Sequence, residues 1–345
     1  MQMYYLAKGF AKQENFKVVL FVRQKHKPSK IPNIEIVHFG LPINRGVPYI
    51  GRYVNKKHIE RTFKESAGKR ILFLGGAEQW EFISVAKRNK IPIIYRINGD
   101  SLVDGSGIAS ECWIDLIMQR VRAADAVVTQ SAHQKHELKK NYGFDSTVIP
   151  SCYEQSQGVK ILNSYQKDDF ILWVGRSVWV KDPLAFLNLA KVLPVKKFVL
   201  VSPPEEPDCD EAIRKAAESL DNVDFFAGMP HKELMELYRR ATAVVSTSET
   251  EGLPNTLIEA CFSYTPYISY RLSFQGVVGS EGIGICSEGS FEKLKSDVLS
   301  IFDDKFAESV AEKQLNYAKN TWNVDTSISK YIELIKDISI SKGGG

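Results

Sequence analysis

Short apolar runs rich in β-branched residues alternate along the chain with segments of helical periodicity. The runs predict strands at 17–22, 34–39, 70–75, 91–97, 126–131, 147–150, 170–175, 197–202, 223–228, 243–248 and 267–271. Amphipathic patterns between them predict helices at 78–89, 182–193, 210–220, 231–242 and 255–262. Strands that alternate with helices are typical of parallel, doubly wound sheets, and continuous apolar runs fit strands covered on both faces. We therefore expect an α/β fold.

A polar, irregular stretch interrupts this alternation at 152–169, CYEQSQGVKILNSYQKDD, and predicts a linker. We expect one domain at 1–151 and a second at 170–318, because 345 residues suffice for two cores of ordinary size. The chain has no apolar run of about 18 residues and its start lacks the pattern of a signal peptide. Five scattered cysteines favour a reduced thiol set, so we expect a cytoplasmic protein.

The net charge of +4 hides an asymmetry between the two halves. Residues 1–150 hold 24 Lys and Arg against 13 Asp and Glu, and the remainder holds 21 against 28. The densest basic segment, 45–70, carries Arg45, Arg52, Lys56, Lys57, Arg61, Lys64, Lys69 and Arg70. A solvated helix face is the simpler interpretation; the alternative is a surface for anionic lipid, at the inner face of a membrane, or for an anionic acceptor. Nucleic acid is disfavoured, because no aromatic stacking platform is interleaved with the charge.

The segment after the strand at 243–248 reads Glu251-Gly252-Leu253-Pro254 and leads into the helix at 255–262. Ligands of open α/β sheets bind beyond the carboxyl ends of the strands, so this is a place to look for chemistry. Gly252 permits a sharp turn, and Pro254 suits the first turn of a helix. Free N–H groups near 254–257 can bind an anion, with Glu251 and Glu259 at its border. The alternative is that the acids only complement the helix dipole.

Two further strand ends carry candidate residues. Arg176 and Lys181 follow the strand at 170–175, and two cations at a strand end suit a diphosphate. After the strand at 223–228, open backbone around Gly228, Met229 and Pro230 could border a planar base.

Three stretches, VGRSVWVKDP, FAGMPHKELMELYRRATAVVSTSETEGLPNTLIEACFSYTPYI and NTWNVDTSISKYIELI, resemble family 4 of the retaining nucleotide-sugar glycosyltransferases. The resemblance implies the GT-B fold, in which two Rossmann-like domains with doubly wound parallel sheets face each other across a cleft. The Glu-x7-Glu motif of that family matches Glu251 and Glu259, and its Arg-x4-Lys motif matches Arg176 and Lys181. It also implies that a helix at 319–340 packs back on the first domain.

The resemblance carries specific roles to these positions. Glu251 would contact hydroxyls of the donor sugar, Glu259 would hold the ribose, and Arg176 with Lys181 would stabilise the leaving diphosphate. The implied donor-binding residues are Gly175, Gly228, Met229, Gly252, Leu253, Pro254, Asn255, Thr256 and Glu259. The resemblance also implies that no metal or other cofactor is required, because the two cations would do what a metal does in other glycosyltransferases. The co-substrate would be a UDP- or GDP-sugar.

A metal site has one weaker candidate, Asp208-Cys209-Asp210, which resembles the DxD motif of metal-dependent transferases. Acids are favoured at the start of a helix in any case, so a structural role is the simpler interpretation. His133 and His136 share a helix face without an evident acidic third ligand, which favours surface histidines.

The first half departs from the family. The strand and glycine loop that usually open the N-terminal domain have no counterpart before MYYLAKGFAKQENFKVVLFV, so we expect a shortened start. Gly75-Gly76 is either a substitute loop or a plain tight turn. Asn98 stands where many relatives carry a His, and it cannot titrate. Asp100 either holds the acceptor hydroxyl or serves as a turn residue.

Three functions fit these observations. The first is a retaining glycosyltransferase that moves a sugar to a saccharide or lipid-linked acceptor. The second, motivated by Asn98 and the missing loop, is a catalytically impaired nucleotide-sugar-binding or scaffold protein. The third is another GT-B enzyme, such as an epimerase or phosphorylase, which the helix after Gly252-Leu253-Pro254 and the Arg176/Lys181 pair disfavour.

Overall fold

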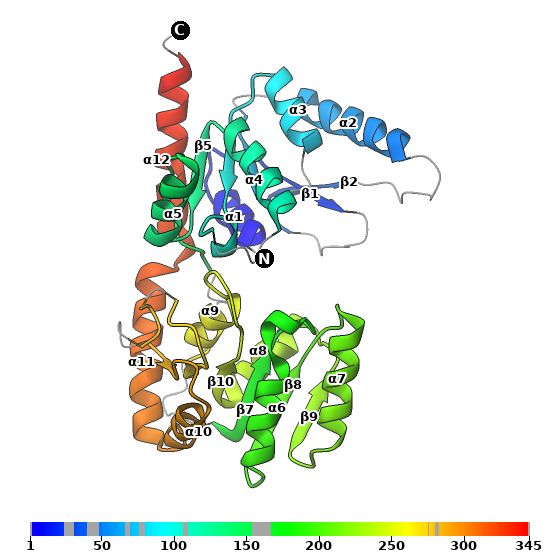
Figure 1. Ribbon diagram of the computed structural model, residues 1–345. Helices are drawn as coiled ribbons and strands as arrows, with labels where there is room; N and C mark the ends of the chain where they lie inside the picture. Colours follow the sequence, from blue (N-terminus) through cyan, green and yellow to red (C-terminus); the bar gives the residue numbers. More distant parts are fainter. Residues whose placement is uncertain are drawn as a thin grey trace. The chain divides into compact units, whose positions relative to one another are not determined.

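The computed structural model describes residues 2–23, 31–39, 48–65, 70–75, 80–105, 110–153, 167–274, 276–279 and 283–343. The chain divides into two compact units, Met1–Glu154 with Val324–Gly345 and Gln155–Asn323. Each unit contains parallel sheets flanked by helices, as Figure 1 shows for both units. The predicted α/β fold is confirmed.

The first unit pairs its strands in parallel in two sheets, β1-β2 and β3-β4-β5-β6. Its strands are β1 Val18–Arg23, β2 Ile34–Phe39, β3 Leu72–Gly75, β4 Ile93–Arg96, β5 Ala126–Thr129 and β6 Thr147–Val148. Its helices are α1 Gln2–Ala11, α2 Pro48–Glu65, α3 Trp80–Arg88, the 3-10 helix η1 Asp100–Leu102, α4 Glu111–Ala123, α5 Ala132–Tyr142 and α12 Val324–Gly343.

The strand β4 is buried along its whole length, which explains its continuous apolar run. Its last residue, Arg96, is charged although it is only 3% exposed and lies among apolar neighbours. Arg96 donates hydrogen bonds to the Ile149 carbonyl, Ser151 Oγ and the Tyr331 hydroxyl of α12. The helix α12 also packs on α1 at Gly9, where an added Cβ would lie 2.6 Å from Ile328. The end of the chain thus completes the core of the first unit.

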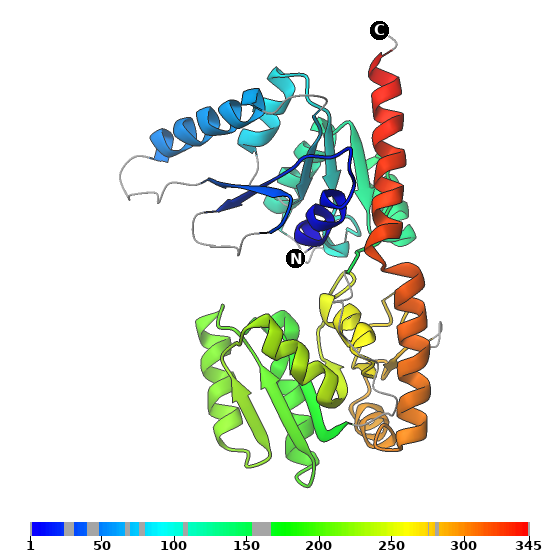
Figure 2. The same cartoon turned by 180° about the vertical axis from the view of Figure 1, so that it is seen from behind.

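The second unit has one parallel sheet of six strands in the order β12-β11-β10-β7-β8-β9. Its strands are β7 Asp168–Val174, β8 Lys197–Val201, β9 Val223–Phe226, β10 Ala241–Ser246, β11 Tyr267–Ser269 and β12 Ile285–Cys286. Its helices are the 3-10 helix η2 Trp179–Lys181, α6 Pro183–Val192, α7 Pro207–Glu218, α8 His231–Arg240, α9 Asn255–Phe262, α10 Phe291–Ser300 and α11 Asp304–Thr321. The helix α11 packs along α9 (Figure 2).

The strand order of the second unit reverses between β7 and β10. The chain builds outward from β7 through β8 to β9, then returns to the other side of β7 and continues through β10 to β12. Such a topological switch point leaves a crevice at the carboxyl ends of the two central strands, where open α/β sheets bind their ligands. Trp173, Phe186 and Phe198 form an aromatic part of the core beneath this edge. The fold alone therefore directs attention to the segments after β7 and β10.

Every strand predicted from the apolar runs is present, and the predicted and observed ends differ by no more than two residues. The short β12 was not predicted, because two residues carry no periodic signal. Pro254 precedes α9 as its N-cap residue and does not lie within the first turn as predicted. Most of the predicted linker, 154–166, lies outside the described residues; Cys152 and Tyr153 are buried in the first unit, and Asp168 begins β7.

Candidate functional site

The segments after β7 and β10 are fastened to each other at the switch point. The backbone N–H of Glu249 donates to the Val180 carbonyl at 2.9 Å. The buried Thr247 hydroxyl donates to the Lys181 carbonyl at 2.8 Å and accepts from the indole N–H of Trp173. The short helix η2 therefore has a fixed position next to the segment that leads into α9. The two predicted sequence motifs form one site.

Lys181 and Glu251 meet in this site as an ion pair between the Lys181 ammonium and Glu251 Oε1. Their side chains are 17% and 21% exposed, so the pair is largely removed from water. Burial lowers the pKa of Lys181 to about 8, and the positive charge of nearby Arg176 acts in the same direction. The contact with the Glu251 carboxylate favours the charged ammonium. The site thus holds a cation that can be released to a more negative ligand.

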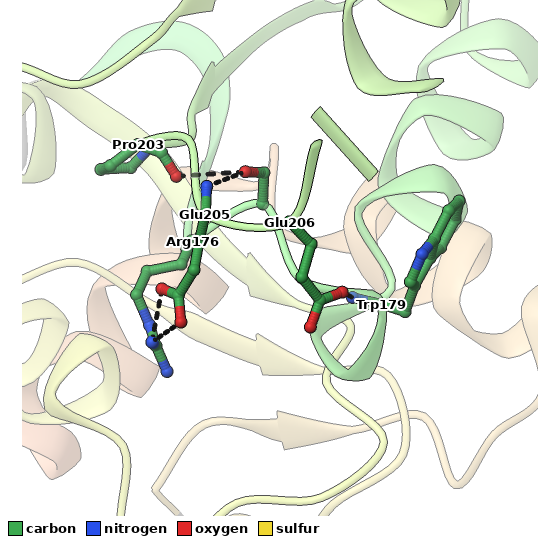
Figure 3. A network of polar contacts seen from close by, with 6 residues as sticks. Arg176, Trp179, Pro203, Glu205 and Glu206 are labelled. Atoms are coloured by element: carbon green, nitrogen blue, oxygen red, sulfur yellow. Dashed lines mark hydrogen bonds and ion pairs between the residues drawn. The ribbon is translucent and has the colours of Figure 1, made fainter. Parts of the chain in front are cut away.

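Arg176 lies at the end of β7 and pairs with Glu205 from the segment after β8, at 2.5 Å. Figure 3 shows how the two segments are joined around this pair. Ser177 Oγ accepts from the Glu205 backbone N–H at 2.7 Å, and Glu206 Oε2 accepts from the Trp179 backbone N–H at 3.1 Å. Both partners of the Arg176–Glu205 pair are exposed, so the guanidinium is available at the surface of the site.

Arg271 is a third cation at this edge, and the sequence analysis did not identify it. It follows β11 and pairs with Asp182 Oδ2 at 2.6 Å while donating to the Thr247 carbonyl. Asp182 has a positive φ of 44° and caps α6 by accepting from the Ala185 N–H. Arg271 thereby holds the residue that follows Lys181. Its position as the last residue of the predicted strand 267–271 was the signal available in the sequence.

Glu259 lies one turn inside α9 and is only 3% exposed. Its Oε1 lies 3.2 Å from Nε2 of His231, the first residue of α8. The bond to Glu259 raises the pKa of His231, and burial opposes this shift. The first turn of α9 contains no acid, so Glu259 is not placed as a dipole-complementing residue there. His231 was also missed in the sequence, where it reads as an ordinary residue at the start of a helix.

The remaining candidates of the second unit surround these pairs. Asn255 is exposed and Thr256 is partly buried in the first turn of α9, whereas Gly252 and Leu253 are partly buried before it. Gly228 has a φ of 114°, which favours glycine, and an added Cβ would lie 3.5 Å from Pro203. Met229 follows it in the loop between β9 and α8, partly buried. Gly175 follows β7, where a Cβ would lie 2.7 Å from the Trp173 ring.

Asn98 and Asp100 belong to the first unit and follow β4. Asn98 is exposed, and its Nδ2 lies 3.0 Å from the position of a Cβ on Gly75, at the end of β3. Asp100 begins η1, and its Oδ1 accepts a 2.7 Å bond from Nε2 of the buried Gln134. The contact identifies Gln134 as a residue that orients the Asp100 carboxylate. Gly76 lies outside the described residues.

The alternative metal motif lies in α7. Cys209 is buried in the core, and Asp210 pairs with Arg214 at 2.8 Å. His136, on α5, has its Nε2 3.8 Å from Glu137. Within the described ranges, no three His, Cys, Asp or Glu side chains gather in a way that could hold a metal ion.

The basic segment 45–70 coincides largely with α2. Residues 45–47 and 66–69 lie outside the described ranges, as does the Arg52 side chain. Lys57, Arg61 and Lys64 are exposed, and Arg61 pairs with Glu65 one turn further along. Across the part of the chain that the structure describes, none of the helices combines the length and apolar character needed to cross a bilayer.

Comparison with known proteins finds a family model that matches part of the chain. Residues 154–322 match the model of the family described as glycosyl transferases group 1. The O-antigen chain mannosyltransferase RfbU of Salmonella typhimurium is 28% identical over 156 residues, which cover 44% of this chain and 44% of that protein. The amylovoran biosynthesis glycosyltransferase AmsD of Erwinia amylovora is 25% identical over 218 residues, covering 58% of this chain and 57% of that protein. The matches thus span about half the length of these relatives.

Solved structures show the fold over nearly the whole chain. Sucrose-phosphate synthase from Thermosynechococcus elongatus superposes with a TM-score of 0.74 at 15% identity, covering 98% of this chain and 93% of that one. Anabaena HepE, solved in complex with UDP, superposes with a TM-score of 0.71 at 14% identity, covering 97% and 95%. Both likenesses concern the fold, which is of the GT-B class.

Proposed function

From the glycosyl transferases group 1 domain at residues 154–322, we propose that this chain is a retaining glycosyltransferase that uses a nucleoside-diphosphate sugar. The observation that carries the proposal is the meeting of Lys181 with Glu251 at the switch point, beside Arg176 and the N-terminus of α9. Cations and free helix N–H groups bind a diphosphate, and a carboxylate binds sugar hydroxyls. The UDP complex of HepE supports the same class of donor.

In the proposed complex, the diphosphate binds between the α9 N-terminus and the two cations. Lys181 turns from Glu251 toward the phosphate oxygens, because a diphosphate carries more negative charge than one carboxylate. Arg176 exchanges its exposed contact with Glu205 for the same ligand. Glu251, released from Lys181, accepts hydrogen bonds from the sugar hydroxyls. In the free protein, the ion pairs thus occupy the same side chains that would bind the donor.

Transfer then proceeds on one face of the sugar. The bond from the anomeric carbon to the phosphate oxygen breaks as the acceptor oxygen bonds to the same face of that carbon. The acceptor proton passes to the departing phosphate oxygen, so the products are a nucleoside diphosphate and a glycoside of retained configuration. Lys181 and Arg176 stabilise the charge that develops on the diphosphate. This role makes a metal unnecessary, and we expect activity to withstand EDTA.

The acceptor is proposed to be a saccharide or a lipid-linked saccharide. The names of RfbU and AmsD, an O-antigen mannosyltransferase and an amylovoran glycosyltransferase, support polysaccharide chemistry. Asn98 and Asp100 of the first unit are the proposed acceptor-side residues. Contact of α2 with an anionic membrane, at the cytoplasmic face, remains a hypothesis. Co-sedimentation with liposomes that depends neither on anionic lipid nor on salt would contradict it.

The test is release of nucleoside diphosphate from a panel of UDP- and GDP-sugars, with and without saccharide acceptors. Lys181→Ala and Glu251→Ala should each lower turnover by at least roughly 100-fold, the usual effect of removing one charge-stabilising group. Lys293→Ala is the matched control, because Lys293 pairs with Glu288 at 3.0 Å on an exposed part of the same unit. Full turnover in a folded Lys181 or Glu251 variant would contradict the proposal.

A second candidate function is nucleotide-sugar binding without turnover, in an impaired enzyme or scaffold protein. The observation that favours it is Asn98, which lacks the titratable ring that the resemblance places at this position. Calorimetric binding of a nucleotide sugar, with neither transfer nor donor hydrolysis, would favour this function over the first.

A further inference from the structure

The burial of Glu259 raises a question that the donor site alone does not answer. A carboxylate that is only 3% exposed needs a cation or hydrogen-bond donors, because an unpaired charge is costly to remove from water. His231 Nε2 supplies this contact at 3.2 Å from Oε1, and the bond raises the pKa of the imidazole. His231 itself is 46% exposed, so one side of the ring faces Glu259 while part of it remains accessible.

The two residues come from neighbouring strand ends of the sheet. His231 begins α8 after β9, and Glu259 lies in α9 after β10. The helices α8 and α9 contact each other, which gives the pair a fixed frame. His231 also follows Gly228, Met229 and Pro230, the open segment proposed to border the base. The pair therefore lies between the proposed base and diphosphate positions, where the ribose of a bound nucleotide would be.

We propose that His231 is a positioning residue that holds the Glu259 carboxylate as an acceptor for the ribose hydroxyls of the donor nucleotide. The chain thereby selects ribonucleotides over 2′-deoxyribonucleotides. This inference rests on the proposed function, in which Glu259 binds the ribose, and adds the residue that makes this binding selective.

The chemistry follows from the contact between the two groups. An ionised carboxylate only accepts hydrogen bonds, and its two oxygens can accept from both ribose hydroxyls while one also contacts His231. Without His231, the buried Glu259 carboxylate loses this contact and is no longer held in one orientation. A carboxylate that is not held in this orientation cannot accept from both ribose hydroxyls at once. Loss of His231 should therefore weaken recognition of the 2′-hydroxyl more than recognition of the diphosphate.

The experiment measures calorimetric dissociation constants of UDP, GDP and their 2′-deoxy analogues with the full chain. The wild type should prefer at least one ribonucleotide over its 2′-deoxy analogue by roughly 10- to 100-fold, as expected for a hydrogen bond to a charged group. In His231→Ala this ratio should fall below about 3 while binding of the diphosphate persists. Glu259→Gln should lower the ratio similarly, and the double variant should lower it no further.

The matched control is His136→Ala, since His136 also has its Nε2 near a glutamate, at 3.8 Å, but lies on α5 of the first unit. It should keep the wild-type ratio. His231→Gln keeps a hydrogen-bond donor without the charge and should give an intermediate ratio of ribonucleotide to 2′-deoxyribonucleotide affinity. If His231→Ala does not fold, this variant tests the proposal in its place. A purely structural His231 would change the melting temperature and leave the ratio intact.

The outcomes separate the two proposals. A wild-type ratio in folded His231 variants, or a wild type that binds UDP or GDP without preference for ribose, overturns this inference and leaves the proposed function standing. A wild type that binds neither UDP nor GDP overturns both. Collapse of the ratio in His231→Ala, with the ratio kept in His136→Ala, supports the assignment.

Discussion

Lys181 and Glu251 form an ion pair, so replacing each residue should change the affinity for a diphosphate in the opposite direction. In the free protein the Lys181 ammonium is engaged by Glu251, so a diphosphate has to compete for it. Glu251→Gln removes the competing charge and leaves the cation in place. Lys181→Ala removes the cation and leaves a carboxylate that repels the ligand.

The expected magnitudes follow from burial. A charge-assisted hydrogen bond contributes about 1.5–3 kcal/mol, so Lys181→Ala should weaken UDP or GDP binding roughly 10- to 100-fold. Glu251→Gln should bind the same nucleotide as well as the wild type or up to about 10-fold more tightly. With side chains 17% and 21% exposed, breaking the pair should cost about 1–3 kcal/mol of folding free energy, less than for a fully buried pair.

UDP and GDP lack the donor sugar that is transferred. Calorimetry with these nucleotides therefore isolates the effect on diphosphate binding from the contacts of Glu251 with that sugar. The double variant should bind like Lys181→Ala, because Glu251 matters here only through Lys181. Lys293→Ala controls for the loss of a lysine elsewhere in the second unit. The reasoning is refuted if Glu251→Gln weakens nucleotide binding as much as Lys181→Ala does, or if Lys181→Ala binds like the wild type.

Four further predictions concern the neighbouring groups. Glu205→Ala frees Arg176 from an exposed ion pair and should tighten UDP or GDP binding by up to about 5-fold at low salt; calorimetry that shows weaker binding would contradict this. Because the pKa of Lys181 is lowered to about 8, nucleotide affinity should fall as the pH rises above 8, and Lys181→Ala should show a flatter profile. The same shift means that the unfolded chain binds more protons between pH 8 and 10.5, so this group should make the ligand-free fold more stable as the pH rises through that window, measured by urea unfolding. Gly175→Ala places a Cβ 2.7 Å from Trp173 and should cost about 1–3 kcal/mol in urea unfolding, and an unchanged midpoint would argue against this tight contact.

The apolar runs predicted the strands well because central strands are buried on both faces. In β10, five consecutive residues are buried, and such a run leaves little ambiguity in the sequence. The motifs after β7 and β10 were assigned to one donor site through the resemblance to the family 4 glycosyltransferases. Their actual contact could not be predicted, since it requires β10 to lie directly beside β7. That neighbour relation is a property of the strand order, which no local pattern contains.

The missed residues have a common physical reason. His231, Arg271 and Glu205 each belong to a segment whose own sequence is ordinary, and their significance comes from a partner on another strand end. The local sequence predicts a diphosphate at Arg176 and carries no sign that Glu205 already pairs with it. Side-chain pairing across the sheet edge depends on distances of a few ångströms. Composition and periodicity carry no information at that scale.

The central claim is that the second unit binds a nucleoside-diphosphate sugar between Lys181, Arg176 and α9. The most direct measurement is a thermal-shift panel of UDP-, GDP- and ADP-sugars on the full chain, because a ligand that binds only the folded state raises its stability. At about 100 times its dissociation constant, a ligand adds about 2.7 kcal/mol, which is several degrees of melting temperature. We expect such a rise for at least one UDP- or GDP-sugar and its loss in Lys181→Ala. No rise with any nucleotide sugar at millimolar concentration would contradict it.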